Sequence, residues 1–93
     1  MTLEIISPEA ALFKGVVSSV KLPGIDGSFQ ILNNHAPIVS TLTEGIVDVE
    51  VLNVEYVQEL EPSITKVTPT RFTFAIGSGT LEMNNNKIIV LVD

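Results

Sequence analysis

The chain contains no cysteine and no tryptophan, and it has only one histidine and one tyrosine among its 93 residues. Without cysteine it can form neither disulfides nor thiolate metal sites, and cysteine usage gives no indication of its compartment. A single imidazole cannot build the usual transition-metal site, which needs several converging ligands. We therefore predict no bound metal.

Long apolar runs are also missing. No stretch approaches the ~20 apolar residues that cross a bilayer as a helix, so we expect no direct membrane insertion. The first ten residues, MTLEIISPEA, contain neither a basic segment nor a long apolar one, and so do not resemble a secretory signal. Any association with a membrane is expected to depend on a partner protein.

Basic residues are scarce. Five Lys and Arg stand against eleven Asp and Glu, which gives a net charge of −6 at pH 7. A surface this acidic repels phosphate backbones, so nucleic acid is not an expected partner. A basic surface on another protein is a better match.

Apolar residues, in contrast, are abundant. They make up 45% of the chain, and the mean hydropathy is +0.42. A domain of this size buries only about 60–65% of the surface that its unfolded chain exposes. Two interpretations fit: an exposed apolar patch, which usually marks a protein interface, or simply a core rich in valine and isoleucine.

The apolar residues recur with a period of two and nowhere with a helical period, which indicates β-strands. The alternation is clear in residues 45–51 and 71–76. In residues 15–22 it predicts that Val16, Val20 and Leu22 share one face. The final run, KIIVLV (87–92), is apolar on both faces, which is typical of a central strand covered on both sides.

Clusters of Gly, Pro and Asn punctuate these strands at residues 23–27, 77–79 and 84–86, and each cluster predicts a turn. Residues 61–70, EPSITKVTPT, are predicted to be an extended loop or the tip of a long hairpin. Strands with turn signals every 8–12 residues or so predict an all-β fold. We expect one β-sandwich domain over residues 1–93, with about eight to ten short, mostly antiparallel strands.

Motifs of catalysis are absent. The segment IGSGTL (76–81) does not have the Gly-x-Ser-x-Gly spacing, and it falls between two predicted strands. No Gly-rich loop leads into a helix, so no nucleotide is expected to bind. Asp48 and Glu50 alternate with valines and fit a solvated strand face better than a ligand pair. We predict that the chain is not an enzyme and holds no cofactor.

The one histidine lies at a corner, in the segment NNHAP (33–37). Pro37 fixes its own φ and biases Ala36 toward extended geometry, so the corner is stiff. The preceding asparagines can adopt left-handed conformations or bind their own backbone. The side chain of His35 is therefore either presented to a partner protein or hydrogen-bonded to nearby backbone groups.

The segment around this corner, LPGIDGSFQILNNHAPIVSTL (22–42), is similar to the signature of the epsilon subunit of F-type ATP synthases. The flanks agree: LEIISPE (3–9) and LFKG (12–15) resemble the opening strands of that family, and residues 75–93 resemble its closing strands. The positions that match the signature are Leu22, Pro23, Gly24, Gly27, Phe29, Ile31, Leu32, His35, Ala36, Pro37, Ile38, Val39 and Leu42.

Two features depart from the family pattern. The middle of the chain, residues 50–70, looks longer than the usual hairpin of the family, so the resemblance assigns no role to it. Most family members also continue into a C-terminal two-helix domain, which resemblance associates with inhibition of hydrolysis and, in some members, with ATP binding. Residues 1–93 do not contain that domain.

The resemblance implies a non-catalytic rotor subunit of the central stalk, which couples the gamma subunit to the membrane ring so that ion-driven rotation powers ATP synthesis. The implied location is peripheral, on the cytoplasmic face of the bacterial inner membrane. By family position, the ring-facing residues are Asp26, Gly27, Ser28, Phe29 and Gln30. The residues near the junction of gamma and the ring are His35, Ala36, Pro37 and Ile38.

Two other classes of function stay open from the residues alone. One is a free-standing β-sandwich module that binds a peptide or another protein; a sugar-binding module fits less well, because the chain has no Trp and a single Tyr. The other is a small metal-dependent or histidine-dependent enzyme. Co-purification with gamma would favour the stalk subunit, and metal analysis would test the enzyme.

Overall fold

The structure is a computed structural model and describes residues 1–62 and 64–93. Within these residues the chain forms ten strands and a single turn of 3₁₀ helix, η1. The bounds are β1 Thr2–Ile6, β2 Ala11–Gly24, β3 Gly27–Leu32, β4 Ile38–Leu42, β5 Gly45–Val51, η1 Val54–Tyr56, β6 Val57–Leu60, β7 Thr65–Thr68, β8 Arg71–Ile76, β9 Gly79–Asn84 and β10 Lys87–Val92.

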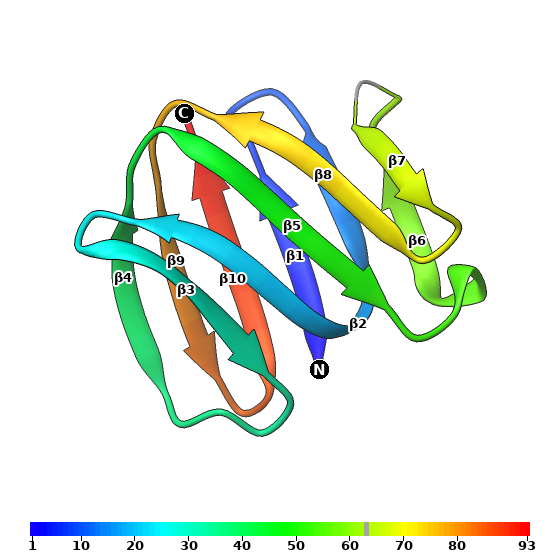
Figure 1. The fold of residues 1–93 in the computed structure, drawn as a ribbon, viewed down its shortest axis with the longest axis horizontal. Helices are drawn as coiled ribbons and strands as arrows, with labels where there is room; N and C mark the ends of the chain where they lie inside the picture. The colour runs from blue at the N-terminus through cyan, green and yellow to red at the C-terminus, as the bar shows by residue number, and fades with distance from the viewer. Residues whose placement is uncertain (63) are drawn as a thin grey trace.

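The strands form two layers, which Figure 1 shows one behind the other. The front sheet contains β3, the second half of β2, β5, β8 and β7. The back sheet contains β6, the first half of β2, β1, β10, β9 and β4. All pairs are antiparallel except β1–β10, which is parallel. The predicted all-β sandwich of mostly antiparallel strands is confirmed.

Strand β2 belongs to both layers. Its first residues pair with β1 and β6, and its last residues pair with β3 and β5. The ladder with β5 shifts register between Val17 and Ser19, so the strand carries a bulge there. The bulge changes which side chains point inward: Val17 is buried and Val16 only half-buried. The predicted shared face of Val16, Val20 and Leu22 is therefore wrong at Val16.

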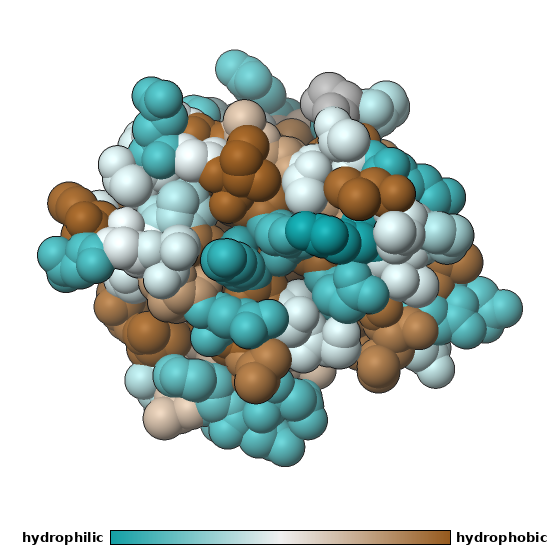
Figure 2. Space-filling model, viewed as in Figure 1, coloured by the Kyte–Doolittle hydropathy of each residue, from teal (hydrophilic) through white to brown (hydrophobic). Residues whose placement is uncertain are grey.

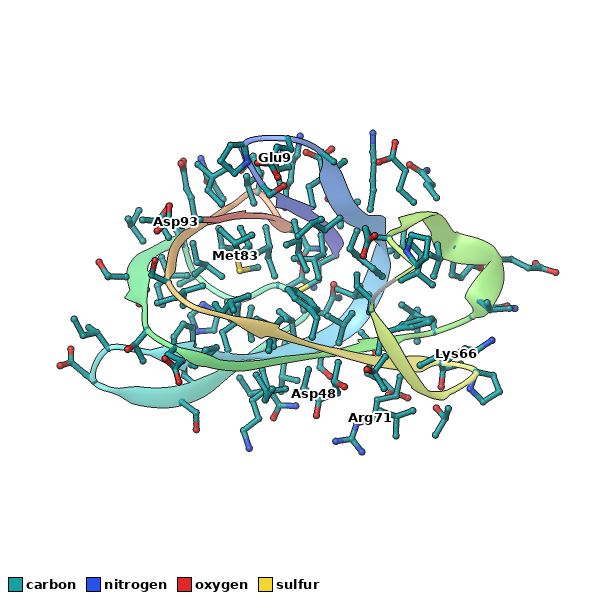
Figure 3. The ribbon with its side chains drawn as sticks, turned by 90° about the horizontal axis from the view of Figure 1, so that it is seen from above. Glu9, Asp48, Lys66, Arg71, Met83 and Asp93 are labelled. Atoms are coloured by element: carbon teal, nitrogen blue, oxygen red, sulfur yellow. The ribbon has the colours of Figure 1, made fainter. Side chains whose placement is uncertain are left out.

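The core lies between the two sheets and consists of apolar side chains. Figure 3 shows Met83 in this layer, whereas Asp48 and Arg71 point away from it. Phe13 from β2 and Phe72 from β8 meet there, with ring centroids 6.1 Å apart and planes tilted by 53°. Among the described residues no polar side chain is buried, so the interior is held by apolar packing alone.

Two of the three predicted turns lie at the two ends of β9. The β9–β10 turn has positive φ at Asn85 and Asn86, as a two-residue hairpin of type I′ requires. Residues 77–78 carry the chain from β8 in the front sheet to β9 in the back sheet. The segment 61–70 contains β7, which forms a hairpin with β8; Ser63, within that predicted segment, lies outside the described residues.

The last strand, β10, differs from its prediction in one respect. It is central, since it lies between β1 and β9. Its inner side chains, Ile88, Val90 and Val92, are buried, but Ile89 is half-buried and Leu91 is 50% exposed on the outer face. The prediction that both faces are covered is wrong, because the fold supplies no third layer over the back sheet.

Candidate partner-binding surfaces

The β2–β3 hairpin carries the first group of predicted residues. Ile25 and Asp26 form the two-residue turn, and Gly27 follows with a φ of +120°, which a residue with a side chain rarely adopts. Asp26, Gly27, Ser28 and Gln30 are exposed, whereas Phe29 is half-buried and packs against the core. The hairpin tip therefore offers one carboxylate and the apolar side chain of Ile25, which is 66% exposed.

The connection from β3 to β4 carries the second group. The backbone N–H of His35 donates to the carbonyl of Leu32 at 3.2 Å, and its ring Nδ1 lies 2.7 Å from the carbonyl oxygen of Ala36. The imidazole is nonetheless exposed, as are Ala36 and Pro37, while Ile38 packs against the core. His35 can therefore be held by nearby backbone groups and still present its imidazole to a partner protein.

Asparagine side chains hold this corner in place. Asn33 Oδ1 accepts from the N-terminal ammonium of Met1 at 3.1 Å and from Asn86 Nδ2 at 2.9 Å. The backbone N–H of Asn34, which has a φ of +62°, donates to Asn86 Oδ1 at 2.8 Å. The corner is therefore tied to the start of the chain and to the β9–β10 turn, which makes it stiffer than Pro37 alone would.

The two groups of predicted residues do not form one surface. They lie at opposite ends of β3, whose six residues span about 20 Å. Figure 1 shows the β2–β3 hairpin at the left end of the sandwich and the β3–β4 connection along its lower edge, next to the β9–β10 turn. A partner that contacts both groups must extend along the sandwich, or two partners must share them.

The outer face of the back sheet carries apolar side chains beside the second group. Ile6 on β1 lies opposite Leu91 on β10, and Val39 on β4 is 80% exposed. The cross-strand row from β4 to β1 reads Val39, Glu82, Ile89 and Glu4. Glu4 also pairs with Lys14 at 3.5 Å. This face, which we call the back face, alternates apolar and charged side chains.

The outer face of the front sheet is polar in its middle, as Figure 2 shows. Arg71 on β8 binds Asp48 on β5 with two hydrogen bonds, Nε to Oδ1 at 2.9 Å and Nη2 to Oδ2 at 2.6 Å. The hydroxyl of Thr70 donates to Glu50 at 3.0 Å. The charged groups of this face thus largely satisfy one another, which confirms the prediction that Asp48 and Glu50 lie on a solvated strand face.

The Asp48–Arg71 pair predicts a pH-dependent stability. The hydrogen bonds from Arg71 lower the pKa of Asp48 in the folded chain. The stability that the ionised carboxylate contributes is therefore complete above the unfolded pKa of about 3.9 and is lost as the pH falls through the lower folded value. We expect Asp48→Asn to destabilise the domain at pH 7, and we expect this destabilisation to shrink as the pH falls through the lowered folded-state pKa of Asp48.

Urea unfolding of both proteins across this pH range tests the expectation. Asp26→Asn is the matched control, because Asp26 is exposed and has no side-chain partner among the residues that the structure describes. Equal destabilisation by Asp48→Asn at both ends of the pH range would contradict a role for the ionised carboxylate.

Sequence reasoning missed the exposed apolar residues that flank the predicted sites. The exposure of Ile25 could have been predicted, since an isoleucine within the turn sequence PGIDG does not lie on a strand face that packs on the core. The exposure of Leu91 could not be predicted, because residues 88–92 are apolar at every position and so do not reveal which side is covered. That of Val39 could not either, because the short segment IVSTL (38–42) does not alternate.

Two kinds of functional feature are absent from the described residues. In residues 1–62 and 64–93, no three His, Asp or Glu side chains lie together as candidate metal ligands. The same part of the chain contains no helix long and apolar enough to cross a membrane.

Comparison with known proteins connects this geometry to a family. The family described as ATP synthase, Delta/Epsilon chain, beta-sandwich domain matches residues 1–57. The ATP synthase epsilon chain of Campylobacter fetus is 37% identical over 91 residues, covering 98% of this chain and 59% of the relative. That of Chlorobaculum tepidum is 32% identical over 92 residues, covering 99% of this chain and 88% of the relative. The chain thus spans about three-fifths of the Campylobacter relative and most of the Chlorobaculum one.

Solved structures share the fold. A chain of the central stalk and c-ring of the Tetrahymena thermophila mitochondrial ATP synthase superposes with a TM-score of 0.67 at 16% identity, covering 99% of this chain and 62% of that chain. A chain of the Euglena gracilis mitochondrial ATP synthase superposes with a TM-score of 0.69 at 16% identity, covering 97% and 48%. At these identities the likeness shows the fold. On the evidence of the family match and its relatives, the chain belongs to the delta/epsilon chain β-sandwich family of ATP synthases.

Proposed function

We propose that this chain is a non-catalytic rotor subunit in the central stalk of an F-type ATP synthase. It clamps the gamma subunit to the membrane ring, so that ion-driven rotation of the ring turns gamma within the catalytic head. Its location is peripheral, on the cytoplasmic face of the bacterial inner membrane, and its partners hold it there. The support is family membership together with apolar side chains that the fold leaves uncovered.

The back face is the proposed contact with gamma. The observation that carries this proposal is strand β10, whose outer side chains Ile89 and Leu91 are apolar although they face solvent. A partner that covers them supplies the missing third layer and removes their apolar surface from water, at about 25 cal/mol per Å². His35, Ala36 and Pro37 lead into β4 at the edge of this face, so one partner can engage both.

The tip of the β2–β3 hairpin is the proposed contact with the ring. It presents the carboxylate of Asp26 and the exposed side chain of Ile25, with Ser28 and Gln30 beside them. Polar loops with a basic residue would complement this tip, and the rigid two-residue turn limits the entropy lost on contact. The hairpin and the back face together provide the two separated attachments that a clamp needs.

The test is co-purification with gamma. We expect a one-to-one complex that survives moderate salt, and we expect Leu91→Lys to weaken it by about tenfold or more, because an unpaired ammonium would be buried. His35→Ala should weaken the complex without unfolding the free domain. Ala75→Lys is the matched control, since Ala75 is exposed on the front sheet. Affinity is measured by titration, and folding by circular dichroism.

Three outcomes would count against the proposal. The chain could stay monomeric in the presence of gamma, which would leave a free-standing peptide-binding module as the better reading. Ala75→Lys could weaken the complex as much as Leu91→Lys, which would remove the back face as the contact. His35→Ala could unfold the free domain as strongly as it weakens the complex, which would make the corner structural.

A further inference from the structure

Asn86 lies in the β9–β10 turn, 52 residues after Asn34 in the chain, and it is not among the predicted site residues. The residue is half-buried, and its side-chain amide makes two hydrogen bonds to the corner that carries His35. Oδ1 accepts from the backbone N–H of Asn34 at 2.8 Å, and Nδ2 donates to Oδ1 of Asn33 at 2.9 Å. One side chain therefore uses both ends of its amide on two consecutive residues of the corner, which Figure 1 shows beside the β9–β10 turn.

The two residues that Asn86 binds lead directly to His35. Asn33 and Asn34 are the central residues of a turn, which is closed by the hydrogen bond from the His35 N–H to the carbonyl of Leu32 at 3.2 Å. Asn34 has a φ of +62°, a conformation that is uncommon for residues with a side chain. Such a conformation persists where surrounding contacts hold it, and the bond from Asn34 to Asn86 is a contact of this kind. The direction in which His35 leaves the turn thus depends on Asn86.

The orientation of both amides is fixed by groups that can only donate. At one end the backbone N–H of Asn34 faces Asn86, so the amide oxygen of Asn86 must point toward it. At the other end the N-terminal ammonium of Met1 donates to Asn33 at 3.1 Å, so Asn33 must also present its oxygen. Between them, Asn86 must donate through Nδ2. Its position therefore requires a side chain that accepts one hydrogen bond and donates another.

We propose that Asn86 is a positioning residue for partner binding. Its amide holds the turn at Asn33 and Asn34 in the conformation that presents His35 to the gamma subunit. This inference rests on the proposed function for the identity of the partner. A corner that is already held loses less conformational entropy on binding than a mobile one, so Asn86 strengthens binding through His35 and not through a contact of its own.

Asn86→Gly removes both hydrogen bonds and keeps the turn. The φ of Asn86 is +59°, which glycine adopts readily, and Asn-Gly is a preferred sequence for a two-residue type I′ turn. Asn85→Gly is the matched control, since it makes the same substitution one residue earlier, where φ is +51°. The side chain of Asn85 has no hydrogen-bond partner in residues 1–62 and 64–93. The two variants therefore differ in the side-chain hydrogen bonds that they remove.

Amide hydrogen exchange in the free chain measures how firmly the turn is held. We expect Asn86→Gly to speed exchange of the Asn34 N–H by about tenfold, because that group loses its acceptor. Asn85→Gly should leave the rate unchanged. This measurement needs no partner, so its outcome does not depend on whether gamma binds.

Titration with gamma measures the consequence for binding. We expect Asn86→Gly to weaken the complex by about fivefold, because the freed corner must be ordered on binding. Asn85→Gly should leave the affinity unchanged. If Asn86 acts through His35, Asn86→Gly should cause less than about a further twofold loss in a His35→Ala background. A residue that itself touched gamma would give an independent, additive loss.

Three results would overturn the proposal. Exchange of the Asn34 N–H could be as slow in Asn86→Gly as in the unchanged chain. Asn85→Gly could weaken the complex as much as Asn86→Gly does. Finally, the losses from Asn86→Gly and His35→Ala could add in full. A chain that binds no gamma at all would refute the proposed function, and hydrogen exchange would then decide alone whether Asn86 holds the turn.

Discussion

Phe13→Ala is expected to lower the free energy of unfolding by about 3–5 kcal/mol, the usual cost of deleting a buried phenylalanine side chain. The ring is 1% exposed and contacts Phe72, which is equally buried, across the two sheets. Small domains are stable by only about 5–15 kcal/mol in total, so the variant should retain little stability. Urea unfolding followed by circular dichroism measures the change.

Phe74→Ala provides the matched control. Phe74 lies on β8 with Phe72, but its side chain is only half-buried. Its loss removes less surface from the core and should cost clearly less than the loss of Phe13. A double-mutant cycle between Phe13 and Phe72 should return a coupling of about 0.5–1.5 kcal/mol. Equal costs for Phe13→Ala and Phe74→Ala would contradict the two-layer packing described above.

The second large effect is expected at Gly79. A methyl group there would meet the carbonyl oxygen of Leu91 and would lie 3.4 Å from the Cα of Val92, both on the paired strand β10. Because these are backbone atoms of a ladder, they cannot rotate away. Gly79→Ala should therefore destabilise the domain by about 2–3 kcal/mol, the upper part of the range of about 1–3 kcal/mol that is typical of overpacked cores. For a domain of this size that corresponds to a fall of about 10–20 °C in melting temperature.

Gly77, two residues earlier, allows a controlled comparison. No atom lies within 4 Å of the position that its Cβ would take, and its φ lies outside the left-handed region. Gly77→Ala should leave stability unchanged or raise it by up to about 1 kcal/mol, because the unfolded chain loses freedom. If thermal melts show the same loss for both variants, steric contact with β10 is not the cause.

The order of strands and turns could be read from the sequence where local chemistry decides it. Alternation identified β5 and β8, and the run of asparagines marked the β9–β10 turn because asparagine tolerates a positive φ. The bulge in β2 could not be predicted. The segment GVVSSV has apolar residues on both parities, so either register satisfies its pattern, and only the passage of β2 from one sheet to the other selects one.

The candidate site could be predicted as a list of residues but not as an arrangement. Residues 22–42 form one continuous motif, in which the turn at 23–27 and the corner at 33–37 are recognisable, but the motif does not say where on the sandwich each of them lies. The separation follows from β3, which is extended and therefore puts Asp26 and His35 at different places on the sandwich. The exposure of Leu52, Val54, Tyr56 and Leu60 was missed for another reason: alternation in this part of the chain indicates a strand, but it does not say whether other strands cover it.

The parallel pairing of β1 with β10 has a consequence for how the chain reaches its native state. Residues 2–6 find their partners at residues 87–91, nearly the whole length of the chain away. Closing such a long loop lowers the entropy of the chain before the contact contributes any stabilisation. Folds dominated by distant pairings therefore take about milliseconds to seconds to form. Until residues 87–91 have been synthesised, β1 lacks that neighbour. The backbone groups along one edge of β1 then have no partner strand. Folding therefore passes through a stage in which β1 is already made but one of its edges has no partner, and an unpaired edge of this kind favours aggregation.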